Sequence, residues 1–152
     1  MRKFLAALAA PALVLAAAAS SSAAVADTAS WNAFPGTDSR WHCGPTVTIR
    51  SGFQAQSCIV KATDAISYQG ATIINLAAPT RVYGVTETYE AGTFTGLRNC
   101  STSLNPELRP AGRSVCFSKT VTGSRGNAVQ TRSLVEAGAS EKLWTSPTIV
   151  LG

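Results

Sequence analysis

The stretch that decides the fold runs from Cys100 to Cys116 and reads CSTSLNPELRPAGRSVC. Its two cysteines enclose a segment rich in Pro, Gly and Ser, and the second cysteine opens a run of strand-like residues. An earlier stretch, from Cys43 to Cys58, has nearly the same layout. Fourteen residues lie between its cysteines, against fifteen in the later stretch.

The residues after each second cysteine are also similar, because Cys58-Ile-Val-Lys61 matches Cys116-Phe-Ser-Lys119. This echo indicates a duplicated hairpin unit, and coincidence in a chain rich in Thr, Ser and Ala is the alternative. Four cysteines allow three disulfide connectivities. The echo favours Cys43–Cys58 and Cys100–Cys116, each worth about 3 kcal/mol in the loop-entropy model.

Residues 1–26 have the pattern of a secretory signal peptide. Met1-Arg2-Lys3 is positively charged, 4–19 is an Ala-rich apolar run, and Ala24-Val25-Ala26 fits the small-x-small cleavage pattern. The apolar run is short for a membrane span, which needs roughly 20 apolar residues. We therefore expect cleavage after Ala26, which leaves one secreted domain, 27–152, that does not bind a membrane.

The oxidising space outside the cell favours two disulfides over a zinc site. Zinc would need closer cysteine pairs or nearby histidines, and His42 is the only histidine. Loss of Arg2 and Lys3 with the leader lowers the net charge of +5 by two. The remaining Lys and Arg residues are scattered along the sequence, which argues against a nucleic-acid partner.

Strand-like runs alternate with Gly, Pro and Ser turns along 27–152. We expect strands at 46–50, 54–62, 71–76, 81–89, 93–101, 114–122, 127–137 and, interrupted, at 143–151. Residues 27–41 are expected to lie as a loop across the domain or to form a loose arm, and 64–70 to form a turn or a loose connection. Seven or eight short strands without an amphipathic helix predict an all-β fold, a β-sandwich or small barrel, with an immunoglobulin-like topology as the default.

Two strands have an informative alternation. The strand 81–89 places Tyr83, Val85, Glu87 and Tyr89 on one face. The strand 114–122 is expected to be half-buried, since apolar positions at Val115 and Phe117 alternate with small polar ones.

No catalytic arrangement is visible. His42 lies between Trp41 and Cys43, and no serine has a nucleophile-elbow sequence. Glu87 and Glu90 are three residues apart, so a strand points them to opposite faces rather than into a glycosidase pair. The calcium-loop spacing of an EF-hand is also absent. We expect a non-enzymatic domain without metal or cofactor.

Two kinds of binding surface are possible. Aromatic residues could form a platform for sugar rings, with core packing as the alternative: Trp31, Trp41, Trp144, Tyr68, Tyr83 and Tyr89. The Cys100–Cys116 loop could instead present Leu104, Leu108 and Arg109 to a protease, because a rigid loop binds at a lower entropic cost. An ordinary stapled turn is the alternative to that role.

The Ala-rich leader, the Trp41-His-Cys43-Gly start, the paired cysteines and the Cys-x-x-Lys repeats resemble small secreted proteins of actinobacteria. The resemblance implies no activity. The sequence thus predicts a secreted β-sandwich that binds an extracellular protein or glycan, or has a structural role. The alternatives are a protease inhibitor or effector that presents the Cys100–Cys116 loop, and a carbohydrate-binding module.

Overall fold

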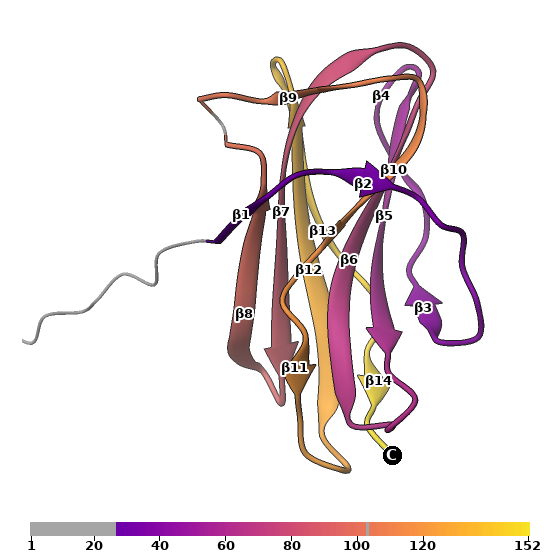
Figure 1. Cartoon of the computed structure of the whole chain (residues 1–152), viewed down its shortest axis with the longest axis vertical. Helices are drawn as coiled ribbons and strands as arrows, with labels where there is room; N and C mark the ends of the chain where they lie inside the picture. The colour runs from indigo at the N-terminus through magenta and orange to yellow at the C-terminus, as the bar shows by residue number, and fades with distance from the viewer. Residues whose placement is uncertain (1–26, 103) are drawn as a thin grey trace, which may run out of the picture.

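The computed structural model describes residues 27–102 and 104–152, so the expected signal peptide, 1–26, lies outside the described residues. In the described part the chain forms fourteen β-strands and no helix. The strands make two sheets, packed together as the sandwich that the sequence predicts (Figure 1).

We name the two layers sheet A and sheet B. Sheet A has the order β1 (Asp27–Ala29), β8 (Thr93–Cys100), β7 (Thr80–Glu90), β12 (Ala128–Ala137) and β13 (Ser140–Thr145), with β14 (Ile149–Val150) beside β12 and β9 (Glu107–Arg109) beside β7. Sheet B has the order β2 (Asn32–Ala33), β10 (Gly112–Phe117), β6 (Ser67–Leu76), β5 (Phe53–Lys61) and β3 (Trp41–Cys43), with β11 (Val121–Thr122) beside β6 and β4 (Val47–Arg50) beside β5.

The order of the long strands agrees with an immunoglobulin-like topology. Among the described strands, seven have six residues or more, namely β5, β6, β7, β8, β10, β12 and β13. In the variable-type immunoglobulin order, the third strand is followed by an added strand in its own sheet, and the last two strands belong to that sheet as well. Here the third and fourth long strands, β7 and β8, pair with each other in sheet A, which also holds the last two, β12 and β13.

The N-terminal segment that begins at Asp27 crosses from sheet A to sheet B, which agrees with the expected course across the domain. It forms two short strands rather than a loop: β1 pairs in parallel with β8, and β2 pairs with β10 (Figure 1). Between them Trp31 enters the core and is only 3% exposed. Gly84 on β7 makes room for it, because a Cβ at this position would lie 2.6 Å from Cζ2 of Trp31.

Small hydroxyl-bearing residues fill the middle of the interface between the sheets. The Oγ1 of Thr72 lies 2.7 Å from the hydroxyl oxygens of Thr86 and Ser133, and Ser133 donates to Ser57 at 2.8 Å. These bonds satisfy the hydroxyls in a buried place, where an unpaired polar group would be costly. Larger apolar residues lie on either side, around Trp31 at one end and around Tyr68 at the other.

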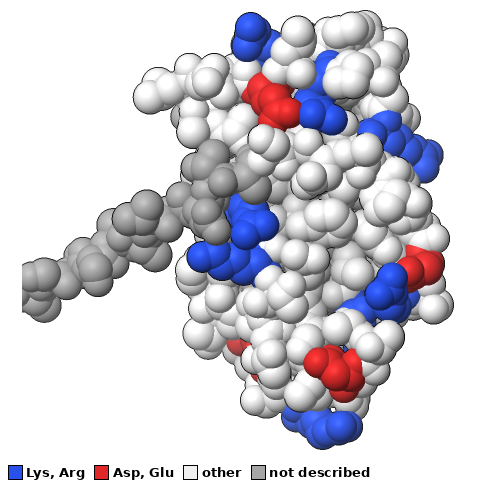
Figure 2. Space-filling view, viewed as in Figure 1, with Lys and Arg blue, Asp and Glu red and all other residues white. Residues whose placement is uncertain are grey.

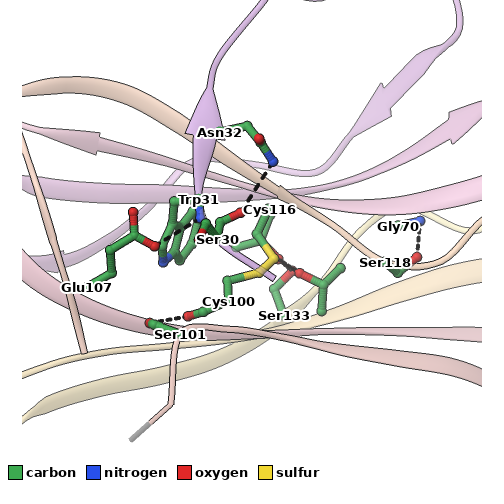
Figure 3. The surroundings of a disulfide bond; sticks show 12 residues. Ser30, Trp31, Asn32, Gly70, Cys100, Ser101, Glu107, Cys116, Ser118 and Ser133 are labelled. Atoms are coloured by element: carbon green, nitrogen blue, oxygen red, sulfur yellow. Dashed lines mark hydrogen bonds between the residues drawn. A yellow bond between two sulfur atoms is a disulfide. The ribbon is translucent and has the colours of Figure 1, made fainter. Parts of the chain in front are cut away.

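Both predicted disulfides, Cys43–Cys58 and Cys100–Cys116, are confirmed, but they have different roles. The first joins directly opposite residues of β3 and β5 within sheet B. The second joins β8 of sheet A to β10 of sheet B, next to Trp31 (Figure 3). Cys58 packs on the outer face of sheet B, whereas Cys116 faces the core between the sheets. The interpretation of two equivalent hairpin units is therefore wrong.

Two strand boundaries also differ from expectation. The turn expected at 64–70 is shorter, because the backbone N–H groups of Ile66 and Ser67 donate to Oδ1 of Asp64 and β6 already begins at Ser67. The single strand expected at 114–122 is divided into β10 and β11. Its first part is buried on both faces, since Cys116 points to the core and Val115 packs on the outer side of sheet B.

The two disulfides fit an oxidising environment such as the cell exterior. Within the part of the chain that is described, no helix long and apolar enough to cross a membrane is found. Lys and Arg side chains lie in separate patches on the face shown in Figure 2, rather than in one basic field.

Candidate functional site

The two outer faces of the sandwich differ in how they are covered. On sheet B, Phe34 and Trp41 pack over an apolar cluster that includes Val115 and Phe117. On sheet A, no described segment packs over the outward side chains in this way. We call the outward side of sheet A the open face.

The open face begins on β7, where residues alternate between buried and partly exposed positions. Tyr83, Val85, Glu87 and Tyr89 share the outward side, as the sequence predicts, and Val82, Gly84, Thr86 and Thr88 are buried. Directly opposite residues of antiparallel strands share a face. The register therefore shows which residues of the neighbouring strands belong to the open face.

Exposed apolar side chains gather on this face. The described residues include five exposed large hydrophobic side chains. Four of them, 47–59% exposed, lie opposite an outward residue of sheet A: Phe94 opposite Tyr89, Leu108 opposite Arg81, Leu143 opposite Leu134, and Val150 opposite Ala128. The fifth, Leu104, is 98% exposed in the loop between β8 and β9. Single exposed apolar residues are ordinary, but their concentration on one face marks an interaction surface.

An ion pair occupies the centre of the open face. Nε of Arg132 lies 2.5 Å from Oε2 of Glu87, directly across from it on β7. The guanidinium also lies 5.2 Å from the ring centroid of Tyr89, whose hydroxyl donates to Glu87 at 3.0 Å. The hydrogen bond to Glu87 raises the pKa of Arg132. The pair is thus fixed in place by the neighbouring ring.

The surface around Arg132 is hollowed on three sides. One hollow of about 200 Å³ lies toward Val85 and Leu143, and a second of about 400 Å³ lies toward Tyr89. A third, a groove of about 680 Å³, follows the edge of the sandwich toward Trp144. Arg132 contributes to all three, so this residue is the point at which they meet.

One end of the open face carries an acidic pair. Glu136 on β12 lies directly opposite Glu141 on β13. Burial raises the pKa of Glu136, and its hydrogen bond with Glu141 and their mutual repulsion raise it further. The same two carboxylates contribute to a raised pKa of Tyr83, for which burial is the largest cause. Like charges in this position destabilise a strand pair, so the acidic pair costs the fold stability.

The Cys100–Cys116 loop is held firmly and presents two leucines. Its β9 strand pairs with β7, and Nη1 of Arg81 donates to the carbonyl of Pro106 at 3.1 Å. Leu104 and Leu108 are exposed. Arg109, the third predicted specificity residue, has a side chain only 18% exposed and paired with Glu107 at 2.6 Å. Arg109 therefore supports the loop instead of being presented by it.

The predicted aromatic platform is dispersed. Trp31 and Tyr68 lie in the core, Trp41 covers sheet B, and Trp144 packs against the core at the sandwich edge. Only Tyr83 and Tyr89 belong to the open face.

The titratable groups that the sequence analysis considered, Glu87, Glu90 and His42, lie apart from one another. Glu90 binds the backbone of Ser124 and the side chain of Asn127, away from Glu87, as expected from their spacing. His42 is half-buried on β3. In the described residues no group of three or more His, Cys, Asp or Glu is placed to hold a metal ion.

Sequence reasoning missed the open face because two of its exposed residues, Leu108 and Val150, come from strands of only three and two residues. No protein-family model matches the chain, and no curated protein matches it.

Proposed function

We propose that this chain is a secreted domain that binds an extracellular protein through the open face. The observation that carries the proposal is the placement of Phe94, Leu108, Leu143 and Val150 on one side of sheet A. The signal-peptide pattern and the two disulfides support secretion.

A protein ligand suits this face better than a sugar. A stacking platform for sugars needs an aromatic ring with a free face, but Arg132 lies over the ring of Tyr89 and Phe94 meets it edge-on. Apolar side chains around a neutralised Arg–Glu pair resemble protein interfaces, where aromatic residues and Arg are enriched in the centre. The acidic pair Glu136–Glu141 favours a partner with a Lys or Arg at that end.

A second candidate is that the loop at the end of this face enters a pocket of the partner. Leu104 favours it, because its side chain is 98% exposed on a loop whose base is fixed by a disulfide. A held loop loses little conformational entropy on binding. The two candidates predict different sensitive residues, Leu104 for the loop and Leu143 for the sheet.

The test compares three forms of the secreted chain, 27–152, immobilised and exposed to extracellular proteins of the producing cells. The first is the natural sequence and the second is F94E/L143E. The third, T48E/T120E, adds the same charge at exposed positions away from sheet A. We expect a protein partner to be retained by the natural chain and by T48E/T120E, and lost from F94E/L143E.

Retention of the same partner by F94E/L143E would contradict the proposal. A fourth form, L104E, tests the loop, and loss of the partner from L104E alone would move the contact to the loop. Sedimentation of the purified chain completes the test: a dimer abolished by F94E/L143E would mean that a second copy covers the face, and no heterologous partner would then be needed.

A further inference from the structure

A separate hollow lies on the other side of the molecule, on the outer face of sheet B. We call it the Arg113 groove. It has a volume of about 140 Å³ and is lined by residues of β5, β6 and β10, by Thr46 and by the segment after β2. None of the residues that line it belongs to the open face.

Polar side chains follow one row across the floor of the groove. Arg113 on β10 lies opposite Asn75 on β6, and Asn75 lies opposite Gln54 on β5. The three positions therefore share the outward side of three adjacent strands. The amides of Asn75 and Gln54 form no hydrogen bond with another described residue, so their donors and acceptors are free for a ligand.

The guanidinium of Arg113 is positioned but not neutralised. It lies 5.8 Å from the ring centroid of Phe34, and Phe34 in turn meets Trp41 edge-on at 5.8 Å. No carboxylate of the described residues pairs with it. A guanidinium stacked on a ring keeps its N–H edge free, and that edge matches the two oxygens of a carboxylate.

The next row supplies an apolar surface and a further amide. Ile73 lies opposite Gln56, whose Nε2 donates to the carbonyl of Gly44 at 2.8 Å. This bond fixes the Gln56 side chain and leaves its oxygen as an acceptor. The hydroxyl-bearing residues Thr37 and Thr46 line the same hollow.

We propose that the Arg113 groove binds a single acidic sugar ring, a hexuronate unit. Arg113 would take the ring's carboxylate, the amides of Asn75 and Gln54 its hydroxyls, and Ile73 with Phe34 its apolar side. A cavity of about 150 Å³ holds benzene, so the groove of about 140 Å³ can take the sugar ring itself while the carboxylate and hydroxyls extend over the polar row. This site is independent of the protein-binding face and would let the domain attach to an acidic polysaccharide.

The test is a titration of the ¹⁵N-labelled chain, 27–152, followed by NMR. D-glucuronate is the probe, glucose tests the ring without the carboxylate, and acetate tests the carboxylate without the ring. We expect saturable shifts at the amides of Gln54, Asn75 and Arg113 with glucuronate, and affinity at least about tenfold weaker with either control, because hydrogen bonds to charged groups are strong.

Variants separate the site from general charge attraction. R113Q should weaken glucuronate binding by about tenfold. R50Q removes an equal charge from the exposed β4 position outside the groove and should leave binding unchanged. The spectra themselves report whether each variant is folded.

The proposal is overturned if glucuronate causes no saturable shift, if acetate or glucose binds equally well, or if R113Q and R50Q behave alike. F94E/L143E should bind glucuronate normally. Failure of one proposal is therefore distinguishable from failure of the other.

Discussion

The contact between Gly84 and Trp31 yields a sharp prediction about how the sandwich is closed. In Gly84→Ala the new methyl group would lie 2.6 Å from Cζ2 of Trp31, closer than real carbon contacts allow. Trp31 is buried, and the Cβ would next meet only the carbonyl oxygen of Leu134 at 3.6 Å, an ordinary contact. The clash is thus with Trp31 itself.

Overpacking of a core by one methyl group costs about 1–3 kcal/mol. Trp31→Ala removes the ring and should cost about 3–5 kcal/mol. In the W31A background the clash is absent, and alanine is the better strand residue by about 0.5–1 kcal/mol. We therefore expect G84A to destabilise the natural chain but to be neutral or stabilising when Trp31 is absent.

The assay is urea denaturation of the four variants of this double-mutant cycle, followed by far-UV circular dichroism. A matched control combines W31A with V129A, because Val129 belongs to a different core cluster. The effects of that distant pair should add within about 0.5 kcal/mol. Equal costs of G84A in both backgrounds would refute the placement of Trp31 against β7.

Two further predictions concern stability. The disulfides close loops of similar size, with sequence separations of 15 and 16, so each should contribute about 3 kcal/mol by the entropy model. C100A/C116A should nevertheless lower the urea midpoint more than C43A/C58A, because Cys100 and Cys116 are both fully buried whereas Cys43 is only half-buried. A larger effect of C43A/C58A would be inconsistent with the position of the Cys100–Cys116 disulfide between the two sheets. The pKa of Glu136 is raised in the folded state above its ordinary value of 4.5. Its favourable contribution to the free energy of unfolding is therefore present below pH 4.5 and is lost as the pH rises through the raised pKa. Glu136→Gln should then stabilise the chain by about 0.2–1 kcal/mol at neutral pH and by nothing in acid, and an equal gain at both pH values in thermal melts would contradict the repulsion from Glu141.

The sequence was sufficient for the fold class, whereas the disulfide connectivity was predicted correctly for a reason that the structure does not support. Strand alternation and turn residues report local structure, so β7 and β12 could be placed within a residue or two. The pairing Cys43–Cys58 and Cys100–Cys116 was reached through an apparent repeat that is not a structural duplication. The two cysteine pairs have similar spacing, but one joins neighbouring strands and the other joins two sheets.

The candidate site could not be predicted because it depends on register between distant segments. Leu108 belongs to the open face only because β9 returns to pair with β7, and Val150 only because β14 pairs with β12. These strands have two or three residues and give no periodic signal of their own. The burial of Arg109 has the same origin, since its partners Glu107 and Ser114 are set by the course of the loop.

Side-chain footprinting by hydroxyl radicals tests the central claim most directly, with the chain compared alone and bound to the partner that it retains. If the open face is the binding surface, labelling of Phe94, Leu108 and Leu143 should fall several-fold on binding. Labelling of Phe34, on the outer side of sheet B, should be unchanged. Protection of Phe34 with unchanged labelling of Leu143 would contradict the assignment of the open face.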